Sequence, residues 1–561
     1  MEIHKLERFP FSIINNVLVG EEVSIENEDI NIGELILNTL KSQPNFIGQV
    51  DATKGKEITF QEIRNESVKL ALWMKMLGVH PGDEILISSN HYAVMYVFFA
   101  SLFIGATPTL WHEKHTFATI NRIMFDAERK IMFIDDILAT AFFDDLLGIK
   151  STVVVFGTFT TFVPYDDLKS QIDTIYNQEV IDEFICAQLD KNKKNIATIL
   201  YTRGVCNFSK PVDIPHATFT AAVNKQVFDM LPAGVGMWVG SFSSLTNLIL
   251  VVCSILWFKR TIRFMGYRKE EICQTLEKHK VNWVLLETYM CREIVNSNLL
   301  NKHDLSSLKM LLFSGSPISY DDRYNLIKSL PITSIISLYA TTETGIISCQ
   351  GENGKMTSCG YVGKNVCVRI INTIFNKKCI ADPYLTGEIC CKHRNIAHVY
   401  HNYDNMPSDL TDIDGWYYTG DLGYFDKDGE IYVLERISDL ILFQQVIFSP
   451  TILENVISRN SAIETVVVVP VIDNDDFEHP IAFISTKPKQ KLNIREVIEE
   501  VNDKLHECMR LRGGVKLLLE MPISLSGNID RFLLREQANE EKYAQIRDPL
   551  RVYNIYQIQQ Y

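Results

Sequence analysis

Short apolar runs alternate with helix-like patterns along residues 59–315. The segment "TFQEIRNESVKLALWMKMLGV" at 59–79 has helical spacing, and a β-rich run, "PGDEILISSN", follows it. Compact apolar runs beside helical or turn segments recur in "NIATILY", "WVLLETYM" and "SLKMLLFSG". Because strands and helices alternate along the chain in this way, we predict α/β layers with largely parallel sheets.

Between Gly360 and Tyr432 the pattern changes to short strands separated by turn residues, as in "TGEICCKH" and "KDGEIYVLER". This spacing predicts a β-rich subdomain built from hairpins. After Glu435, helix-like and strand-like segments alternate again. The expected fold class is therefore α/β, with a large N-terminal domain, 1–434, of two α/β subdomains plus a β-rich subdomain, and a small C-terminal α/β domain, 435–561.

Composition describes an ordinary folded protein, with 46% hydrophobic and 22% charged residues. The 55 Lys and Arg against 69 Asp and Glu give a net charge of −14, so we expect no nucleic-acid partner. The apolar stretches at 92–106 and 248–258 are shorter than the roughly 18 residues of a membrane span, which predicts buried helices. Twelve cysteines without a CxxC pair favour free thiols in a reducing compartment and no zinc site.

The stretch "ILYTRGVCNFSKPVDIPHATF" at 199–219 places a glycine six residues before a lysine. It is not a Walker phosphate loop, which needs GxxxxGK followed by Ser or Thr. It instead resembles the "YTSGTTGxPKG" signature of the adenylate-forming enzymes, a family of acyl-CoA synthetases, 4-coumarate-CoA ligases and beetle luciferases. In this resemblance Thr202, Gly204 and Lys210 match the loop's Thr, first Gly and Lys.

Other segments resemble motifs of the same family in the same order. "FSGSPIS" at 313–319 resembles its adenine loop, and "LYATTETG" at 338–345 resembles its Tyr-Gly-x-Thr-Glu motif. "YYTGDLGYFDKDGEIYVLER" at 417–436 is the most specific match, and "MPISLSGNIDR" at 521–531 is similar to the C-terminal segment that carries a lysine. The resemblance covers about residues 35–540.

The resemblance implies ATP, Mg²⁺ and CoA as cofactors and a carboxylic acid, expected to be a fatty acid, as substrate. Such chemistry needs hydroxyls, backbone N–H groups and cations aimed at phosphates. Thr342 and Glu343 would be catalytic, with Glu343 as the metal ligand. The other implied nucleotide contacts are the adenine loop Gly315, Ser316 and Pro317, the adenine-stacking Tyr339, the ribose-binding Asp421 and its neighbour Arg436.

Several loop positions depart from the family pattern. Arg203, Val205 and Cys206 stand where hydroxyls are expected, so phosphate donors are missing. Pro211 replaces a glycine, which fixes φ and removes a backbone donor. The stretch therefore resembles a phosphate loop by descent that has lost much of its donor chemistry.

The resemblance also makes the C-terminal domain a small mobile cap, with Glu435 at the hinge. Asn528 stands where the catalytic adenylation lysine is expected, and Leu442 and Gln444 replace lysines of the thioester-forming face. Asparagine donates a hydrogen bond but carries no charge. Losing one charge-stabilising donor costs about 3 to 4 kcal/mol, on the order of a hundred- to a thousand-fold in rate.

The acyl side of the site leaves two interpretations open. Phe242, Ser243 and Ser244 lie where relatives place aromatic or His residues against the acyl group, and the apolar run after them suits either an acyl pocket or a core helix. His216 is interpreted as structural, and the other histidines show no acid–base pairing in the sequence.

Two functions follow from these residues. The first is an ATP-dependent acid–thiol ligase of the fatty acyl-CoA synthetase type, acting through an acyl-adenylate. The alternative is a catalytically weakened paralogue that binds nucleotide or acyl ligand without turnover; a light-emitting oxygenase is a weaker third. The expected location is intracellular, in the peroxisome by family resemblance or in the cytoplasm, with no membrane span; the end "IYQIQQY" lacks a Ser-Lys-Leu signal.

Overall fold

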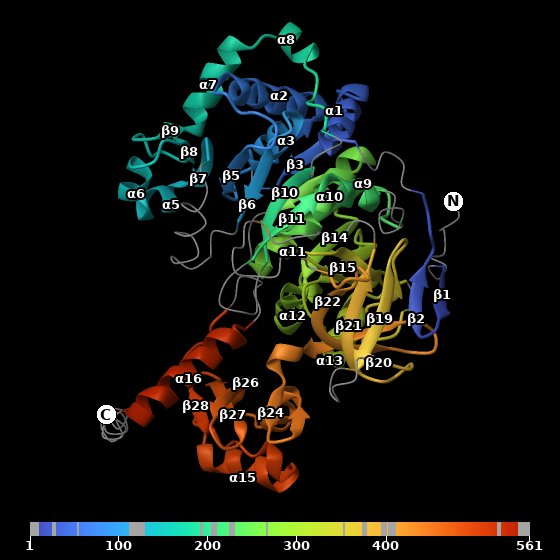
Figure 1. The fold of residues 1–561 in the computed structure, drawn as a ribbon, viewed down its shortest axis with the longest axis vertical. Helices are drawn as coiled ribbons and strands as arrows, with labels where there is room; N and C mark the ends of the chain where they lie inside the picture. The colour runs from blue at the N-terminus through green and yellow to red at the C-terminus, as the bar shows by residue number, and fades with distance from the viewer. Residues whose placement is uncertain are drawn as a thin grey trace. The chain divides into compact units, whose positions relative to one another are not determined.

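The computed structural model describes residues 10–24, 30–52, 55–111, 129–190, 195–202, 210–223, 230–264, 268–351, 354–372, 379–393, 401, 411–523 and 529–547. The chain divides into two compact units. The larger unit contains most of the chain up to Leu434, and the smaller contains Glu435–Tyr561 together with Gly420–Leu422. Figure 1 shows the helices and strands of both.

The first sheet of the larger unit has seven strands in the order β11-β10-β6-β5-β7-β8-β9. All neighbouring strands run parallel except the edge pair β10 and β11. Their bounds are β5 Glu84–Ser88, β6 Thr107–Leu110, β7 Ile131–Asp135, β8 Thr152–Phe156, β9 Val163–Pro164, β10 Ile196–Tyr201 and β11 Pro211–Pro215.

The second sheet has nine strands in the order β18-β17-β16-β15-β14-β12-β13-β3-β4. Its central strands are parallel, whereas β4, β17 and β18 pair antiparallel at the two ends. The bounds are β3 Ile47–Asp51, β4 Glu57–Thr59, β12 Val235–Val239, β13 Arg260–Phe264, β14 Trp283–Glu287, β15 Met310–Ser314, β16 Ser334–Thr341, β17 Gly345–Cys349 and β18 Tyr361–Val362.

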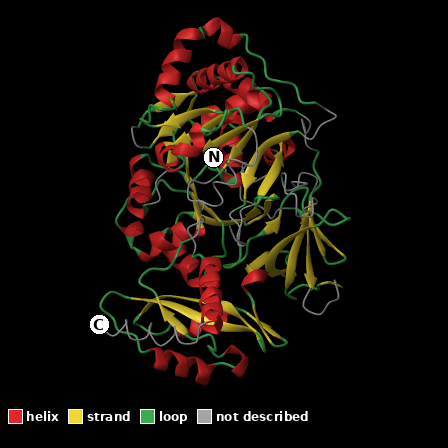
Figure 2. Ribbon diagram, turned by 60° about the vertical axis from the view of Figure 1, so that its left-hand side comes forward, coloured by secondary structure: helices red, strands yellow, loops and turns green. Residues whose placement is uncertain are grey.

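The largest hydrophobic core combines buried residues of both sheets with helices α1, α2, α3, α9 and α10. A second core packs α11, α12 and α13 onto the nine-stranded sheet, and another packs α5 and α6 onto the seven-stranded sheet. Helices therefore cover these sheets, as Figure 2 also shows. The helices are α1 Ile32–Ser42, α2 Phe60–Met76, α3 Val94–Phe103, α5 Asp136–Ala141, α6 Phe143–Leu147, α7 Tyr165–Ile175, α8 Gln178–Asp182, α9 His216–Val223, α10 Leu245–Leu256, α11 Lys269–Lys278, α12 Thr288–Asn296 and α13 Tyr320–Ser329, with a 3-10 turn at Leu299–Asn301.

Local sequence accounts for the start of α2. The Thr59 side chain caps the helix by accepting a hydrogen bond from the backbone N–H of Glu62. Thr59 and Glu62 have the spacing of a capping box, which satisfies N–H groups that the first turn cannot pair. The helix predicted over 59–79 is thus confirmed, with its end at Met76 before Gly78, which has φ of +77°.

A third sheet has the strand order β1-β2-β19-β21-β22-β23, with β20 beside β19. The pairs β1–β2, β2–β19, β19–β20 and β19–β21 are antiparallel. Its core includes Leu18, Val368 and Phe425. The bounds are β1 Phe11–Ile14, β2 Val17–Gly20, β19 Cys367–Asn372, β20 Cys379–Ile380, β21 Gly387–Lys392, β22 Tyr417–Phe425 and β23 Ile431–Arg436. This is the β-rich subdomain that the sequence predicted, although it also recruits the chain's first two strands.

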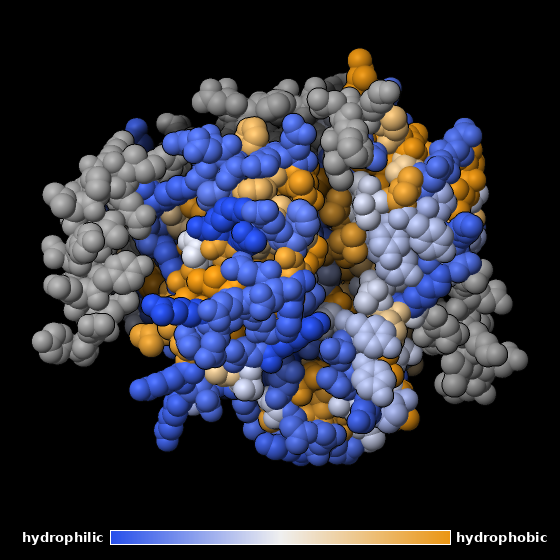
Figure 3. All heavy atoms as spheres, turned by 90° about the horizontal axis from the view of Figure 1, so that it is seen from below, coloured by the Kyte–Doolittle hydropathy of each residue, from blue (hydrophilic) through white to orange (hydrophobic). Residues whose placement is uncertain are grey.

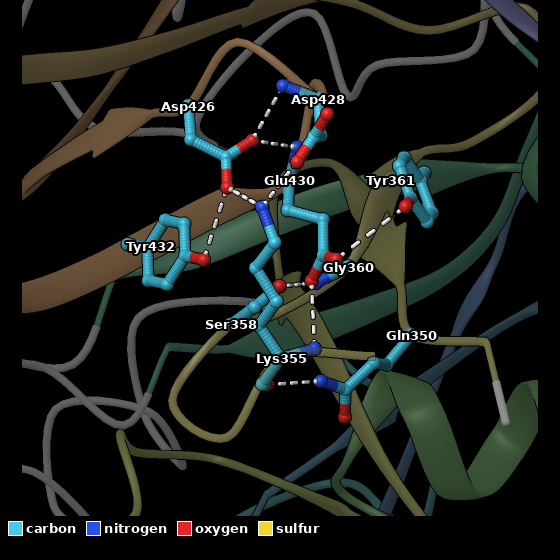
Figure 4. A network of polar contacts seen from close by, with 9 residues as sticks. All are labelled: Gln350, Lys355, Ser358, Gly360, Tyr361, Asp426, Asp428, Glu430 and Tyr432. Carbon is cyan, nitrogen blue, oxygen red and sulfur yellow. Dashed lines mark hydrogen bonds and ion pairs between the residues drawn. The ribbon is translucent and has the colours of Figure 1, made fainter. Parts of the chain in front are cut away.

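The turn between β22 and β23 belongs to the most specific motif, and a polar network holds it (Figure 4). Asp426 accepts hydrogen bonds from the backbone N–H groups of Asp428 and Glu430 at 2.9 and 3.1 Å. The Lys355 ammonium pairs with Asp426 at 2.5 Å and with Asp428 at 2.6 Å. The motif therefore has a structural role in joining the turn to the segment after β17.

The smaller unit has a five-stranded sheet in the order β25-β24-β27-β26, with β28 beside β27. Two cores pack against it, one with α14 and α15 and one with α16. The bounds are β24 Ile441–Phe443, β25 Val446–Phe448, β26 Ile463–Asp473, β27 Phe477–Thr486, β28 Val515–Leu517, α14 Pro450–Ile457, α15 Ile494–Lys504 and α16 Arg531–Arg547, with 3-10 turns at Ile437–Asp439 and Glu507–Met509.

The predicted fold class is confirmed, because the larger unit holds two α/β sheets and a β-rich sheet and the smaller unit is also α/β. Eleven cysteines of the described part are free thiols. Across the described residues, every helix falls short of the length and hydropathy that a membrane crossing requires. The face drawn in Figure 3 is mainly hydrophilic with hydrophobic patches between, which is ordinary for protein surfaces.

Candidate functional site

The hairpin of β10 and β11 carries the two ends of the predicted phosphate loop. Tyr201 pairs with Pro211, and the next residues continue the pairing: the backbone N–H of Thr202 donates to the Lys210 carbonyl at 2.9 Å. The Lys210 N–H donates to the Thr202 hydroxyl oxygen at 3.1 Å. Pro211 lies on the edge strand, where a missing N–H is tolerated. The sheet thus fixes Thr202 and Lys210, while Gly204 lies outside the described residues.

The predicted adenine loop, Gly315 to Pro317, begins directly after β15. Gly315 has φ of +108°, a conformation that favours glycine. The Thr288 hydroxyl, at the start of α12, donates to the Ser316 carbonyl at 2.7 Å and holds this loop. Because β15 is parallel to β14 and β16, the loop lies at the carboxyl edge of the sheet, where α/β proteins bind ligands.

Thr342 and Glu343 lie in the tight turn between β16 and β17, and both are half-buried. Thr341 and Thr344 close the turn: their hydroxyls are 2.9 Å apart, and the Thr344 N–H donates to Thr341 Oγ1 at 3.2 Å. The carboxylate on this short turn offers oxygen ligands to Mg²⁺, and the hydroxyl can donate a hydrogen bond to a phosphate oxygen. The residues present therefore fit the implied metal nucleotide.

Tyr339 is buried, with 7% of its surface exposed, and it belongs to the core of the β-rich subdomain with Leu18, Ile347 and Val362. The pairing of β16 with β17 shifts register directly after it, between Tyr339 and Ala340, as it does at a bulge. Bulges change the direction in which side chains point. The stacking of adenine on Tyr339 stays a prediction.

Asp421 and Arg436 form an ion pair, with Arg436 Nε 3.0 Å from Asp421 Oδ1. Asp421 is buried and Arg436 is partly exposed. Burial raises the pKa of the neighbouring Glu435, although a hydrogen bond from Ser449 and the charge of Arg531 lower it. The predicted ribose residue Asp421 thus pairs with Arg436, which directly follows the predicted hinge residue Glu435.

Asn528 and Gln444 are two positions where the sequence predicts that a lysine of the family is replaced. Asn528, the predicted replacement of the catalytic lysine, lies outside the described residues. Gln444, predicted to replace a lysine of the thioester-forming face, donates its amide to Asp476 at 2.8 Å within the smaller unit. Its side chain therefore joins the turn between β24 and β25, where its φ is +52°, to the turn between β26 and β27.

The segment before α10 is packed in the core. The Phe242 ring contacts the buried Arg263 guanidinium at 4.4 Å and the Trp238 ring at 5.4 Å, and the Ser243 hydroxyl lies 3.0 Å from Ser241 Oγ. Nearly every residue of α10 is buried. The core-helix interpretation thus describes most of this segment, although Ile249 of α10 lines a cavity.

That cavity lies beside the Thr342–Glu343 turn and has a volume of about 10 Å³, which is room for about one water molecule. Thr218 and Ala222 of α9, Ile249 of α10, Gly345 of β17 and His393 after β21 line it. Its walls are mostly apolar, and it is far smaller than the roughly 300 Å³ at which small-molecule pockets begin. A small apolar hollow thus adjoins the predicted phosphate-binding turn, and its walls would have to separate for an acid to enter.

His393 was not identified as a candidate from the sequence. Its Nε2 lies 2.7 Å from the Thr344 carbonyl, which can only accept, so Nε2 carries the proton. The signal was weak, because His393 follows a strand without any neighbouring motif of its own.

The expectation that histidines other than His216 lack acid–base pairing is wrong. His401 contacts Asp213 at 2.7 Å and Glu84 at 2.9 Å, and His479 contacts Asp476 at 2.9 Å. Asp213 and Glu84 are far from His401 in sequence, so only folding brings these three residues together. His216 itself is buried, and its Nδ1 accepts a hydrogen bond from the Ile32 N–H at 3.3 Å, as a structural residue would.

Comparison with known proteins decides the family. The profile of the family described as AMP-binding enzyme matches residues 38–401, more than half of the chain. The chain belongs to the adenylate-forming superfamily. A luciferin 4-monooxygenase of Luciola mingrelica is 24% identical over 509 residues, covering 87% of this chain and 90% of the relative. The 4-coumarate–CoA ligase-like 9 of Oryza sativa subsp. japonica is 22% identical, covering 91% and 93%.

Solved structures show the same fold. ATP-bound MatB from Rhodopseudomonas palustris superposes with a TM-score of 0.77 at 17% identity, covering 90% of this chain and 98% of that one. An identity this low supports the fold alone. The predicted resemblance to the adenylate-forming enzymes is therefore confirmed at the level of family and architecture.

Proposed function

We propose that this protein uses ATP to activate a carboxylic acid as an acyl-adenylate and passes the acyl group to the thiol of CoA. The observation that carries the proposal is the position of the Thr342–Glu343 turn directly beside an apolar cavity. The turn offers oxygen ligands for Mg²⁺ and a donor for phosphate, and the apolar walls of the cavity would separate to take the apolar part of an acid. A carboxylic acid with an apolar part, including a fatty acid, is the proposed substrate class.

In this proposal the implied nucleotide contacts have separate roles. Lys210, Thr342 and Glu343 would act on the phosphates, and Asp421 would bind the ribose hydroxyls. ATP supplies the adenylyl group, and pyrophosphate leaves as the acid's carboxylate bonds to the α-phosphorus. The chain's own residues would orient the phosphates and stabilise the negative charge that develops on them.

A second candidate is a binder that has lost turnover, and the environment of Gln444 favours it. A lysine there would carry a cation, whereas Gln444 is neutral and donates to Asp476 in the turn between β26 and β27. Together with Asn528, this leaves uncharged residues at two positions where the family uses lysine. Nucleotide binding without acid-dependent chemistry would fit this candidate.

Pyrophosphate exchange into ATP tests the proposal. Wild-type protein is assayed with Mg²⁺ and a panel of short, medium, long and aromatic acids, beside E343Q, which removes the proposed metal ligand. We expect exchange that depends on one class of acid and falls on the order of a hundredfold in E343Q. Exchange with none of the acids, combined with measurable ATP binding by calorimetry, would select the binder instead.

A further inference from the structure

A cluster of four charged groups connects distant parts of the larger unit. We call His401, Asp213, Glu84 and Arg129 the His401 cluster. His401 Nδ1 lies 2.7 Å from Asp213 Oδ1, and His401 Nε2 lies 2.9 Å from Glu84 Oε1. Arg129 pairs with the other oxygen of Glu84 at 3.1 Å. Two acids and two bases therefore alternate in one chain of contacts.

The geometry determines the charge of the histidine. Both ring nitrogens face carboxylate oxygens at hydrogen-bond distance, and ionised carboxylates only accept, so both nitrogens must carry protons. Burial lowers the pKa of His401, but hydrogen bonds and charges of Asp213 and Glu84 outweigh burial and raise that pKa to about 9. The pKa of Glu84 is lowered by His401 and Arg129 against the opposing effect of burial.

The cluster joins strands that are not neighbours. Asp213 lies on the edge strand β11, Glu84 lies on β5, and the strands β10 and β6 separate them. The Thr109 hydroxyl of β6 also contacts Glu84, at 3.3 Å. One imidazolium thus ties the edge of the sheet to its middle, beyond what backbone pairing does.

The same histidine contacts the predicted phosphate loop's end. The backbone N–H of His401 donates to the backbone carbonyl of Pro211 at 3.0 Å, and Pro211 directly follows Lys210. Asp213 is two residues further along the same strand. The backbone and the side chain of His401 therefore hold the short stretch that follows Lys210.

We propose that His401 is a positioning residue for nucleotide binding: as an imidazolium between Asp213 and Glu84, it fixes β11 and with it the Thr202–Lys210 pair. This inference rests on the proposed function, because it assigns a nucleotide to that pair. When the pH rises above the pKa of His401, the imidazolium between Asp213 and Glu84 loses its charge. The edge strand β11 is then held less firmly, and the affinity for phosphate falls.

The test measures the affinity of the full chain for Mg²⁺–ATP by calorimetry at about pH 7.5 and about pH 9.5, where the ATP phosphates no longer titrate. Variants are H401Q, which removes the charge, and H401R, which keeps it. The matched control is H479Q, because His479 also lies between two carboxylates, Asp473 and Asp476, but in the smaller unit.

We expect wild type and H479Q to bind about fivefold or more weakly at the higher pH, an ordinary size for coupling between sites. H401Q should bind weakly at both pH values, and H401R should bind tightly at both. A general alkaline effect on the protein would weaken all four alike. H401Q with wild-type affinity and pH dependence would overturn the inference.

A second readout keeps failure of the inference separate from failure of the proposed function. Amide hydrogen exchange at Val212, Asp213 and Ile214 reports the tie without nucleotide, and D213N replaces H401Q if the latter fails to fold. If amide exchange is faster in the variant but wild type does not bind ATP, His401 does hold β11 in place, and its role in nucleotide binding is overturned. Unchanged exchange overturns the tie itself.

Discussion

Arg436 Nε lies 3.0 Å from Asp421 Oδ1, so a carboxylate that is predicted to bind ribose already pairs with a cation. The side chain of Asp421 is 9% exposed and that of Arg436 is 40% exposed. Since a buried carboxylate is costly without a partner, the Arg436 guanidinium offsets that cost and orients the Asp421 side chain.

Replacing Asp421 with Asn should weaken nucleotide binding by about tenfold to a hundredfold, because an amide is a poorer acceptor for two hydroxyls. Calorimetry with AMP measures the change, and D414N, a change at an exposed aspartate outside the site, is the control. Equal AMP affinity in D421N and wild type would remove Asp421 from the proposed site.

Replacing Asn528 with Lys should increase acid-dependent pyrophosphate exchange on the order of a hundredfold, because it restores a charge aimed at the developing negative charge. The control is N460K, which adds the same charge at another asparagine of the smaller unit. No gain in N528K, together with normal ATP binding, would mean that adenylation is lost for other reasons and would favour the binder.

His216 should make the protein less stable in acid. Burial lowers the pKa of His216 from 6.5 to about 4. Between about pH 6.5 and 4 the unfolded chain therefore binds a proton at His216, whereas the folded chain does not. The stability that neutral His216 contributes is fully present above about pH 6.5 and is lost as the pH falls toward 4. The shift corresponds to about 3 kcal/mol.

Urea unfolding of wild type and H216Q between pH 7 and 4 measures this, with Gln able to accept from the Ile32 N–H. The free energy of unfolding should fall more steeply with acid in wild type than in H216Q, by about 2 to 3 kcal/mol across the range. Parallel curves would show that another group causes the acid sensitivity.

Lys355 should stabilise the turn between β22 and β23. K355M leaves Asp426 without its ammonium partner, although the hydroxyl of Tyr432 and two backbone N–H groups remain (Figure 4). We expect the free energy of unfolding to fall by about 1 kcal/mol. K328M, at an exposed lysine of α13, is the control and should change stability by less than about 0.5 kcal/mol.

His393 should limit the size of the acid. H393A removes an imidazole from the cavity wall and its hydrogen bond to the Thr344 carbonyl. Longer acids should then support exchange better than short ones, with a shift of about tenfold in their ratio of kcat/KM, a range typical of one or two methylenes. An unchanged ratio would place the acyl group elsewhere.

Local patterns in the sequence determined much of the architecture. The helix over 59–79 and the apolar runs at β10, β14 and β15 could be predicted because spacing and capping act between near neighbours. Family motifs likewise identified the turn at Thr342 and Glu343. The recruitment of β1 and β2 into the β-rich sheet was missed, because strand pairing over such distances leaves no local trace.

The sequence by itself determined the fold class and the family, since both depend on local spacing and on motifs in a fixed order; the site residues that it predicts stay predictions. Tertiary structure alone decided the partners of His401, which is 188 residues from Asp213 and 317 from Glu84. It also decided that His393 meets α9 and α10 at a cavity. The physical reason is that burial and charge pairing depend on distances that the folded chain creates.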